Sequence, residues 1–145
     1  MSAQVEMKKP TQEDAKLFLM LNQSFNSPSQ RDAGMWFMKE FSAKDYEDFK
    51  TKYPVGSKEW GYVGDVLSYF ETAGVLVSHG LLNENLFFDA SGIEFIWNKI
   101  GQVIPGWQKA ESPAIWENAV WLAKRQQYWK KNVWKPNQKW KSSKR

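Results

Sequence analysis

The sequence predicts an all-α protein, and three observations lead to that prediction. Apolar residues recur every three or four positions over most of the chain, which places them on one face of a helix. Serine, threonine and proline stand where such segments begin, and glycine or proline where they end. Alternation with a period of two, typical of strands, is absent over strand length. We therefore expect a single-domain helical bundle of about six or seven helices with a basic, disordered C-terminal tail.

The composition is that of a globular domain with unusually many aromatic residues. The 145 residues are 42% hydrophobic and 25% charged, and 16% are Phe, Trp or Tyr, so large rings must supply much of the core. The absence of cysteine excludes disulfides, thiolate nucleophiles and cysteine-ligated metals. Because the chain has no apolar run long enough for a signal peptide or a membrane span, we expect it in the cytoplasm.

The first three helices are expected from caps followed by apolar stripes. Thr11, with Asp14 three positions later, has the pattern of a capping box. Ser27-Pro28 pairs an N-cap residue with a first-turn proline, and a third helix should start within 42–45 and stop at Pro54. The predicted apolar faces are Leu17, Phe18, Leu21 and Phe25; Met35, Trp36, Phe37 and Phe41; and Tyr46, Phe49 and Tyr53.

A longer central helix is predicted from Ser57 to about Gly80. Its stripe contains Gly74, and a helical glycine costs about 1 kcal/mol relative to alanine. Either another backbone approaches closely at Gly74, or the helix breaks there. Gly80 suits the position just after a helix end. The other residues of the stripe are Trp60, Val63, Leu67, Phe70 and Val77.

The second half of the chain is predicted to contain a short turn capped by Asn83 and two further helices. One apolar stripe runs from Ile93 to Ile104 and should end at Pro105-Gly106. The last helix is expected to begin at Ser112-Pro113. Its predicted core face comprises Ile115, Trp116, Ala119, Val120, Leu122 and Ala123, continued at the same period by Trp129, Val133 and Trp134.

Charge is distributed unevenly, which suggests a division of the chain. Residues 1–123 contain 11 Lys or Arg against 16 Asp or Glu, whereas residues 124–145 contain nine Lys or Arg and no acid. We expect a flexible N-terminus (1–10), a helical domain (11–135) and a basic disordered tail (136–145). The tail is either a solubilising terminus or a weak electrostatic arm for phosphate backbones or anionic membranes. The candidate polyanion-binding residues are Lys130, Lys131, Lys135, Lys139, Trp140 and Lys141.

An aromatic pair on the last predicted helix lies away from its core face. Trp121 and Tyr128 are one heptad apart, beside Lys124 and Arg125. Exposed aromatic rings next to cations suit a protein contact, so these four are candidate partner-binding residues. The alternative is that a larger bundle covers this helix on both sides.

No motif for catalysis or phosphate binding is assembled in the sequence. The single histidine, His79, precedes a predicted helix end, where capping explains it better than catalysis because no orienting partner is evident. Gly56, Gly61 and Gly64 match neither common phosphate-loop pattern. We therefore expect a protein that is not an enzyme and has no catalytic residues and no cofactor.

Metal and DNA sites are also poorly supported. Asp45 and Asp48 could share a helix face near Glu59 or Asp65, but a solvated acidic face is the commoner explanation, and we expect no metal site. Residues 66–88 loosely suit a helix-turn-helix. Because residues 80–92 contain no Lys or Arg to meet phosphates, we reject that interpretation.

The segments YFETAGVLVSHGLLNENLFFD (69–89), GIEFIWNKIGQVI and SPAIWENAVWLA resemble a bacterial helical family catalogued as domain of unknown function 4760. The resemblance covers most of residues 30–123 and implies an all-helical fold without a known activity. Glu71 and Glu117 are polar positions within it, expected either to hydrogen-bond across helices or to contact a partner. The positions that carry the resemblance are Phe70, Glu71, Gly74, Gly80, Leu81, Trp97, Trp116, Glu117 and Asn118.

Two functional hypotheses remain at this stage. The leading one is a non-enzymatic cytoplasmic module that binds another protein or forms a homo-oligomer. It depends on the aromatic excess and on the face containing Trp121 and Tyr128. The alternative is weak binding of nucleic acid or an anionic membrane surface through the basic C-terminal segment, with an affinity that falls steeply with salt.

Overall fold

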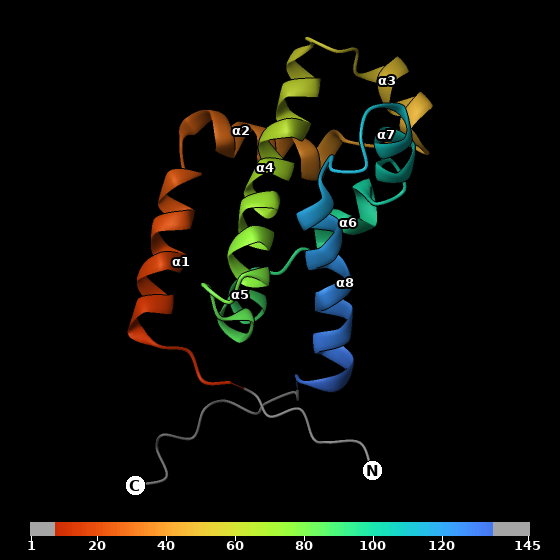
Figure 1. Ribbon diagram of the computed structural model, residues 1–145. Helices are drawn as coiled ribbons and strands as arrows, with labels where there is room; N and C mark the ends of the chain where they lie inside the picture. Colours follow the sequence, from red (N-terminus) through yellow and green to blue (C-terminus); the bar gives the residue numbers. More distant parts are fainter. Residues whose placement is uncertain (1–7, 135–145) are drawn as a thin grey trace, which may run out of the picture.

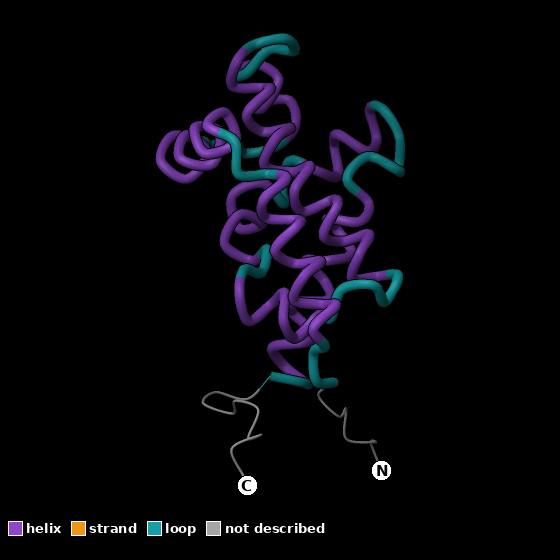
Figure 2. The backbone as a smooth tube through the Cα atoms, turned by 90° about the vertical axis from the view of Figure 1, so that its left-hand side faces the viewer, coloured by secondary structure: helices purple, strands orange, loops and turns teal. Residues whose placement is uncertain are grey.

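The computed structural model describes residues 8–134 and confirms the all-α prediction, with eight helices and no strand in that range (Figures 1 and 2). Of the N-terminus predicted to be flexible (1–10), residues 1–7 lie outside the described residues, and so does the whole of the tail predicted to be disordered (136–145). The helices are α1 (Gln12–Ser24), α2 (Pro28–Glu40), α3 (Tyr46–Lys52), α4 (Lys58–Ser78), α5 (Glu84–Ala90), α6 (Glu94–Ile100), α7 (Ile104–Ala110) and α8 (Glu117–Asn132).

Helix α4 is the centre of the fold. It packs most extensively against α8 and α2, and Figure 1 shows it between α1 and α8. Gly74 does not break it: a Cβ at this position would lie 2.8 Å from the carbonyl carbon of Asn118, and closer still to the carbonyl oxygen. Of the two explanations for Gly74, close approach of another backbone is therefore the one that the structure shows.

The predicted helix from Ile93 to Ile104 is wrong, because it is two helices. The chain turns after Gly101, and Ile104 begins α7 with Pro105 in its first turn. A proline in the first turn of a helix costs no hydrogen bond, because an N–H at that position would have no partner within the helix. Pro105 therefore lies at the start of a helix, where the sequence had suggested a helix end. This extra helix, together with counting the turn after Asn83 as α5, gives eight helices rather than six or seven.

The start predicted for the last helix is also wrong. Residues Ser112 to Trp116 form turns, in which the Ala114 N–H donates to Ser112 Oγ at 3.1 Å, and α8 begins at Glu117. Trp116, the residue before α8, adopts a left-handed conformation (φ 54°) and offers no side-chain cap. A bulky residue in this conformation is strained, so the surrounding packing must hold it.

Side chains from distant helices supply caps that α6 and α8 lack locally. Ile93 precedes α6 without a side-chain cap, and the buried Gln126 of α8 takes that role. Gln126 Oε1 accepts hydrogen bonds from the Ile93 N–H at 2.7 Å and the Glu94 N–H at 2.8 Å. The start of α6 is thus fixed by α8.

Aromatic rings fill the core at the end of the molecule that contains α3 and α7. The ring centroids of Trp107 and Tyr46 are 5.7 Å apart, those of Trp60 and Trp107 5.0 Å, and those of Phe49 and Trp60 5.2 Å. The indole N–H groups of Trp107 and Trp116 are buried without a hydrogen-bond partner among the described residues. Apolar packing therefore holds these two indoles without a hydrogen bond from their N–H groups.

The two tryptophans predicted to extend the core face of α8 differ. Trp129 is 4% exposed and donates its indole N–H to Asn85 Oδ1 at 2.7 Å. Trp134 is 39% exposed, because α8 has already ended and its ring stacks on the outside of Trp129. The core prediction is confirmed for Trp129 and wrong for Trp134.

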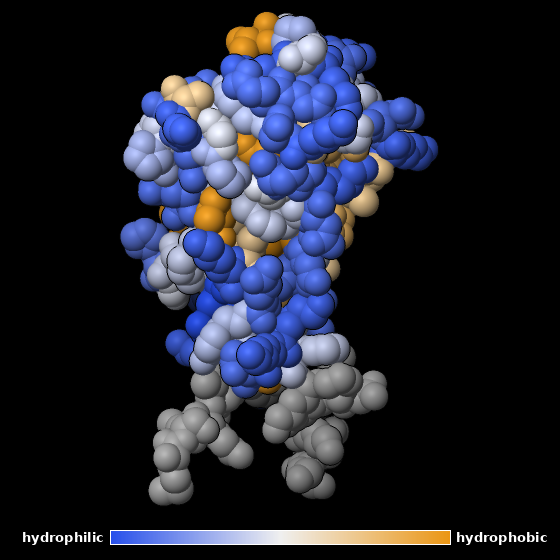
Figure 3. Space-filling model, turned by 90° about the vertical axis from the view of Figure 1, so that its right-hand side faces the viewer, coloured by the Kyte–Doolittle hydropathy of each residue, from blue (hydrophilic) through white to orange (hydrophobic). Residues whose placement is uncertain are grey.

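The face on the right-hand side of Figure 1 is largely hydrophilic, with small apolar patches between polar side chains (Figure 3). None of the helices within residues 8–134 combines the length and the apolarity needed to cross a membrane.

Candidate functional site

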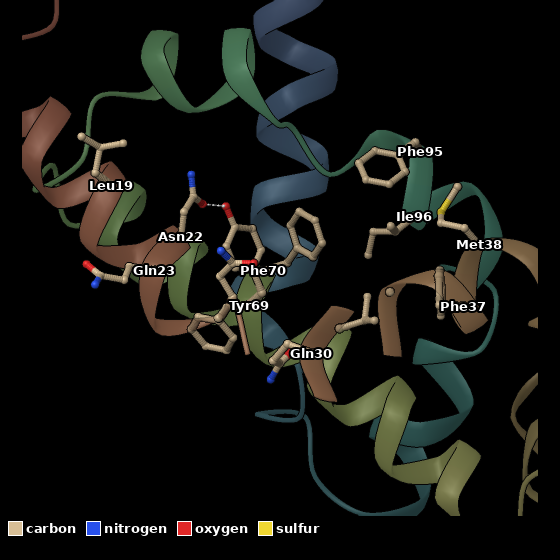
Figure 4. A pocket seen from close by; sticks show the side chains of 14 residues that line it. Leu19, Asn22, Gln23, Gln30, Phe37, Met38, Tyr69, Phe70, Phe95 and Ile96 are labelled. Carbon is tan, nitrogen blue, oxygen red and sulfur yellow. Dashed lines mark hydrogen bonds between the residues drawn. The ribbon is translucent and has the colours of Figure 1, made fainter. Parts of the chain in front are cut away.

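The candidate site is a groove on the side of α4 that does not face α8. Helices α1, α2, α4 and α6 surround a hollow of about 530 Å³ lined by fourteen residues, none of which is charged (Figure 4). We call it the neutral groove. Its floor includes Val66 and Phe70 of α4 and Phe37 of α2, with Ile96 on the α6 side. A volume of this size, with mostly apolar walls, is typical of binding pockets.

Local caps in the sequence position two walls of the neutral groove. The Thr11–Asp14 capping box forms as predicted, with the Thr11 N–H donating to Asp14 Oδ2 at 2.8 Å, and it starts α1. Ser27 caps α2 by accepting from the Gln30 N–H at 3.2 Å. Because only three residues separate α1 from α2, the two helices meet at a corner (Figure 1), and residues of both line the groove.

One partly buried hydrogen bond joins α1 to α4 at the wall of the groove. The Tyr69 hydroxyl donates to Asn22 Oδ1 at 2.5 Å, and the Tyr69 ring meets Phe25 edge-on with centroids 5.4 Å apart. Burial raises the pKa of Tyr69, so its phenol stays protonated and acts as a donor at neutral pH. The side-chain amides of Gln23, Asn26 and Gln30 complete the polar part of the lining.

Large apolar side chains are exposed at the rim of the groove. Leu19 of α1 is 65% exposed, and Met38 of α2 and Phe95 of α6 are roughly half exposed. All three line the hollow and project from different helices (Figure 4). An exposed apolar patch around a hollow typically marks a contact with a protein or another apolar partner.

Gly34 keeps one wall of the neutral groove open. It lies in the interior of α2, where glycine costs about 1 kcal/mol relative to alanine, and it lines the hollow. A Cβ at this position would have no heavy atom within 4 Å. Packing within the chain therefore does not require this glycine, and any longer side chain would occupy the groove.

The four residues proposed for partner binding lie together on α8, and none of them lines the neutral groove. Trp121, Lys124 and Tyr128 are exposed on α8. Arg125 donates Nε and Nη2 to the two carboxylate oxygens of Glu84 at 2.6 and 2.7 Å, and this pairing raises its pKa. Its guanidinium also lies 4.6 Å from the centroid of the Tyr128 ring. The structure thus shows Arg125 engaged within the chain, linking α8 to α5.

Trp121 and Arg125 line a second hollow, of about 550 Å³, whose character is different. Its lining includes charged side chains of both signs, among them Lys8, Asp14 and Glu84. The Lys8 carbonyl oxygen accepts hydrogen bonds from the side-chain amides of Asn83 and Asn85, which fastens this segment to the start of α5. The contacts around this second hollow join the two ends of the described chain to α5.

Most of the candidate polyanion-binding residues lie outside the part of the chain that the structure describes. Lys130 forms an ion pair with Glu94, with Nζ and Oε2 2.7 Å apart, and Lys131 is exposed. Lys135, Lys139, Trp140 and Lys141 lie beyond residue 134. The described residues therefore include two members of this set, of which Lys130 is ion-paired.

Glu71 hydrogen-bonds across helices, which is one of the two alternatives proposed for it. Its Oε1 accepts from the Asn118 backbone N–H at 3.2 Å and the Asn118 side-chain amide at 2.9 Å, and its Oε2 accepts from the Ala119 N–H at 2.9 Å. Glu71 therefore caps α8 in place of the strained Trp116. Glu117 is exposed in the first turn of α8.

Three of the titratable groups considered for catalysis or metal binding, His79, Asp45 and Asp48, lie at helix ends, whereas Asp65 lies in the interior of α4. His79 is the exposed C-cap residue of α4. Asp45 caps α3 by accepting from the Asp48 N–H at 2.8 Å, and Asp48 accepts from the Lys44 N–H at 2.8 Å. Within residues 8–134, no three His, Cys, Asp or Glu residues are grouped in a way that could hold a metal ion.

The fold and the groove together define a small helical domain with an uncharged cleft. Within this class, the chain belongs to the family Domain of unknown function (DUF4760), whose sequence model matches residues 10–126. The resemblance seen in the sequence is thereby confirmed. Comparison with curated proteins and with solved structures finds no match.

Several residues that carry the family resemblance meet where α4 crosses the start of α8. Glu71, Gly74, Trp116 and Asn118 are joined there by the cap and the close backbone approach already described. Phe70, their neighbour, is buried and lines the neutral groove from the other side of α4. The resemblance therefore identifies a structural joint and does not locate an activity.

Sequence reasoning missed the neutral groove. Leu19 lies outside the apolar stripe of α1, and Gly34 interrupts the pattern of α2 without a packing reason. These two departures from helical patterning are the signals that could have indicated it. Neither of them reveals that α4 and α6 complete the site.

Proposed function

We propose that this chain is a non-enzymatic protein-interaction module of the cytoplasm, and that it contacts its partner through the neutral groove. The observation that carries the proposal is the combination of an uncharged hollow with large exposed apolar side chains at its rim. The centre of a protein interface is depleted of charged residues, and large apolar side chains that are buried there supply much of the binding energy.

Two further features support the proposal. Leu19 and Met38 bury little of their apolar surface within the chain, so a partner that covers them gains the free energy of that burial. Gly34 leaves the hollow open although alanine would stabilise α2. Both features have a stability cost that a binding role explains.

The alternative, weak binding of nucleic acid or an anionic membrane surface, has less support in the described residues. Arg125 and Lys130 are already paired with carboxylates, which reduces the charge that they offer to phosphate groups. Truncation of the chain after Pro136 tests this alternative. Binding of single-stranded or duplex DNA that falls steeply with salt and disappears on truncation would favour it.

Site-specific photo-crosslinking tests the groove proposal directly. A benzophenone amino acid replaces Leu19 in one variant and Met20 in another; these adjacent residues of α1 are 65% and 62% exposed, and only Leu19 lines the groove. We expect a discrete protein cross-link in cells from position 19 and not from position 20. The same cross-link should be lost when Gly34→Met fills the hollow, and be retained in Gly61→Met, where the glycine lies on an exposed turn of α4.

A position-19 product that resists Gly34→Met, or equal products from positions 19 and 20, would contradict the proposal. The first result would mean that the hollow is not the contact site. The second would mean that exposed apolar residues of α1 are labelled without specificity.

A further inference from the structure

A homodimer is the assembly whose requirements the neutral groove meets most completely. A two-fold interface pairs one face with an identical face, so that face must contain both a hollow and the groups that cover it. The neutral groove provides the hollow, and Leu19, Met38 and Phe95 are exposed around it. One face of one chain therefore has both halves of a self-complementary contact.

Charge favours the same conclusion. A face that meets its own copy brings each charge toward a like charge, which disfavours pairing. The fourteen residues lining the groove avoid this problem because none is charged. By contrast, the face around Trp121 and Tyr128 also exposes Lys124 and Lys131, and self-pairing would bring these cations together.

Two cations, Lys99 and Arg31, contact residues that line the groove. Lys99 donates its ammonium to the Met38 carbonyl oxygen at 2.9 Å and lies 5.8 Å from the centroid of the Phe37 ring. Arg31 donates Nε to Asn26 Oδ1 at 2.9 Å. These contacts anchor both cations to groups of the chain at the edge of the groove.

We propose that the occupant of the neutral groove is a second copy of this chain, related by a two-fold axis, with the rim side chains of each copy covering the hollow of the other. This inference rests on the proposed function, because it names the partner at the same site. It excludes the basic segment and the face around Trp121 from the interface.

Sedimentation velocity over a wide concentration range tests the proposal with the full chain. We expect the wild type to sediment at twice the chain mass of 17.0 kDa, with a dissociation constant that changes little between low and high salt because the residues that line the groove are uncharged. Leu19→Lys replaces an apolar rim side chain, which covers the hollow of the other copy, with a charged one, and should weaken dimerisation by about 100-fold. Met20→Lys, one residue away, should change it by less than about threefold.

A second pair of variants guards against effects on folding. Gly34→Met fills the hollow and should give a monomer, whereas Gly61→Met should remain a dimer. Far-ultraviolet circular dichroism of all four variants should match the wild type. Sedimentation at 17.0 kDa at every concentration, or equal weakening by Leu19→Lys and Met20→Lys, would overturn the proposal.

The crosslinking experiment separates this inference from the proposed function. A position-19 product with a different protein, in a chain that sediments as a monomer, overturns the second copy as occupant and leaves the groove as an interaction site. If no position-dependent product forms with any protein, both proposals fail.

Discussion

The two sides of α4 differ in how completely other parts of the chain cover them and pair their polar groups. On the side facing α8, Glu71 caps the partner helix and Gly74 lets the backbone of Asn118 approach within contact distance. On the other side, Tyr69 and Phe70 border a hollow with exposed Leu19 and Phe95 at its rim. The first side is closed by specific contacts, and the second is open.

This difference separates the residues that maintain the fold from those available for binding. Changes at the closed joint should lower stability, because each removes a hydrogen bond or forces two backbones apart. Changes at exposed positions of the open groove, such as Leu19 and Gly34, should leave the fold intact, because little within the chain packs against them. The following predictions test this separation, beginning with the largest expected effect.

Gly74→Ala should be the most destabilising small change at the joint. The added Cβ would lie under 3 Å from the backbone carbonyl of Asn118, so α4 and α8 must separate. We expect the free energy of unfolding to fall by about 3 kcal/mol, measured by urea denaturation. Gly64→Ala on the same helix is the control, since a Cβ there meets nothing within 4 Å and should be neutral or stabilising. Equal effects of the two substitutions would contradict this account of the joint.

Glu71→Ala should have the next largest effect. It removes the acceptor of three hydrogen bonds and leaves the start of α8 uncapped, because Trp116 cannot replace it. We expect a loss of about 2 kcal/mol in the free energy of unfolding. Glu117→Ala is the matched control, an exposed acid at the same helix start, and should cost no more than about 0.5 kcal/mol. A comparable loss for Glu117→Ala would show that any negative charge near the start of α8 stabilises the helix, and that the hydrogen bonds accepted by Glu71 do not matter in particular.

On the open side, Gly34→Ala should stabilise the protein. The methyl group meets no atom within 4 Å, so the gain in helix propensity is not offset by a clash. We expect the free energy of unfolding to rise by about 0.5–1 kcal/mol, seen as a higher melting temperature. Destabilisation would mean that a methyl group at this wall of the groove meets another group in solution.

Asp14→Asn should have the smallest effect, and it should depend on pH. Burial opposes ionisation of Asp14, but hydrogen bonds from Thr11 and from the Asn83 N–H outweigh it and lower its pKa from 3.8. Because the pKa is lower in the folded state, the carboxylate stabilises the fold above pH 3.8, and this contribution is lost as the pH falls through the folded-state pKa. The stability difference between wild type and variant should therefore be constant above about pH 5 and vanish in stronger acid. A difference that persists in strong acid would contradict this assignment.

The sequence predicted helices well where their caps are local. Thr11, Ser27, Ser57 and Asn83 each accept a hydrogen bond from the first turn of the helix that follows. The predicted end of the helix that starts at Ile93 was wrong because Pro105 lies in the first turn of a further helix, α7. The predicted start of α8 was wrong because its cap comes from a distant residue, Glu71. A local pattern contains no information about such contacts.

The neutral groove could not be predicted for a related reason. It combines residues of four helices, and most of them, such as Phe37 and Phe70, have the spacing of ordinary core residues. Whether a stripe of apolar residues is fully covered depends on how the helices are arranged. That arrangement depends on the same long-range contacts that the sequence pattern does not reveal.

The dependence of earlier helices on α8 has a consequence for synthesis on the ribosome. Gln126 fixes the start of α6, Trp129 donates to Asn85 of α5, and α8 covers Gly74 and Glu71 of α4. These contacts join residues 32 to 48 positions apart, so they cannot form until the last described helix has emerged. The nascent chain therefore cannot complete this core before α8 has left the ribosome, and until then α4, α5 and α6 expose apolar surface that α8 later covers.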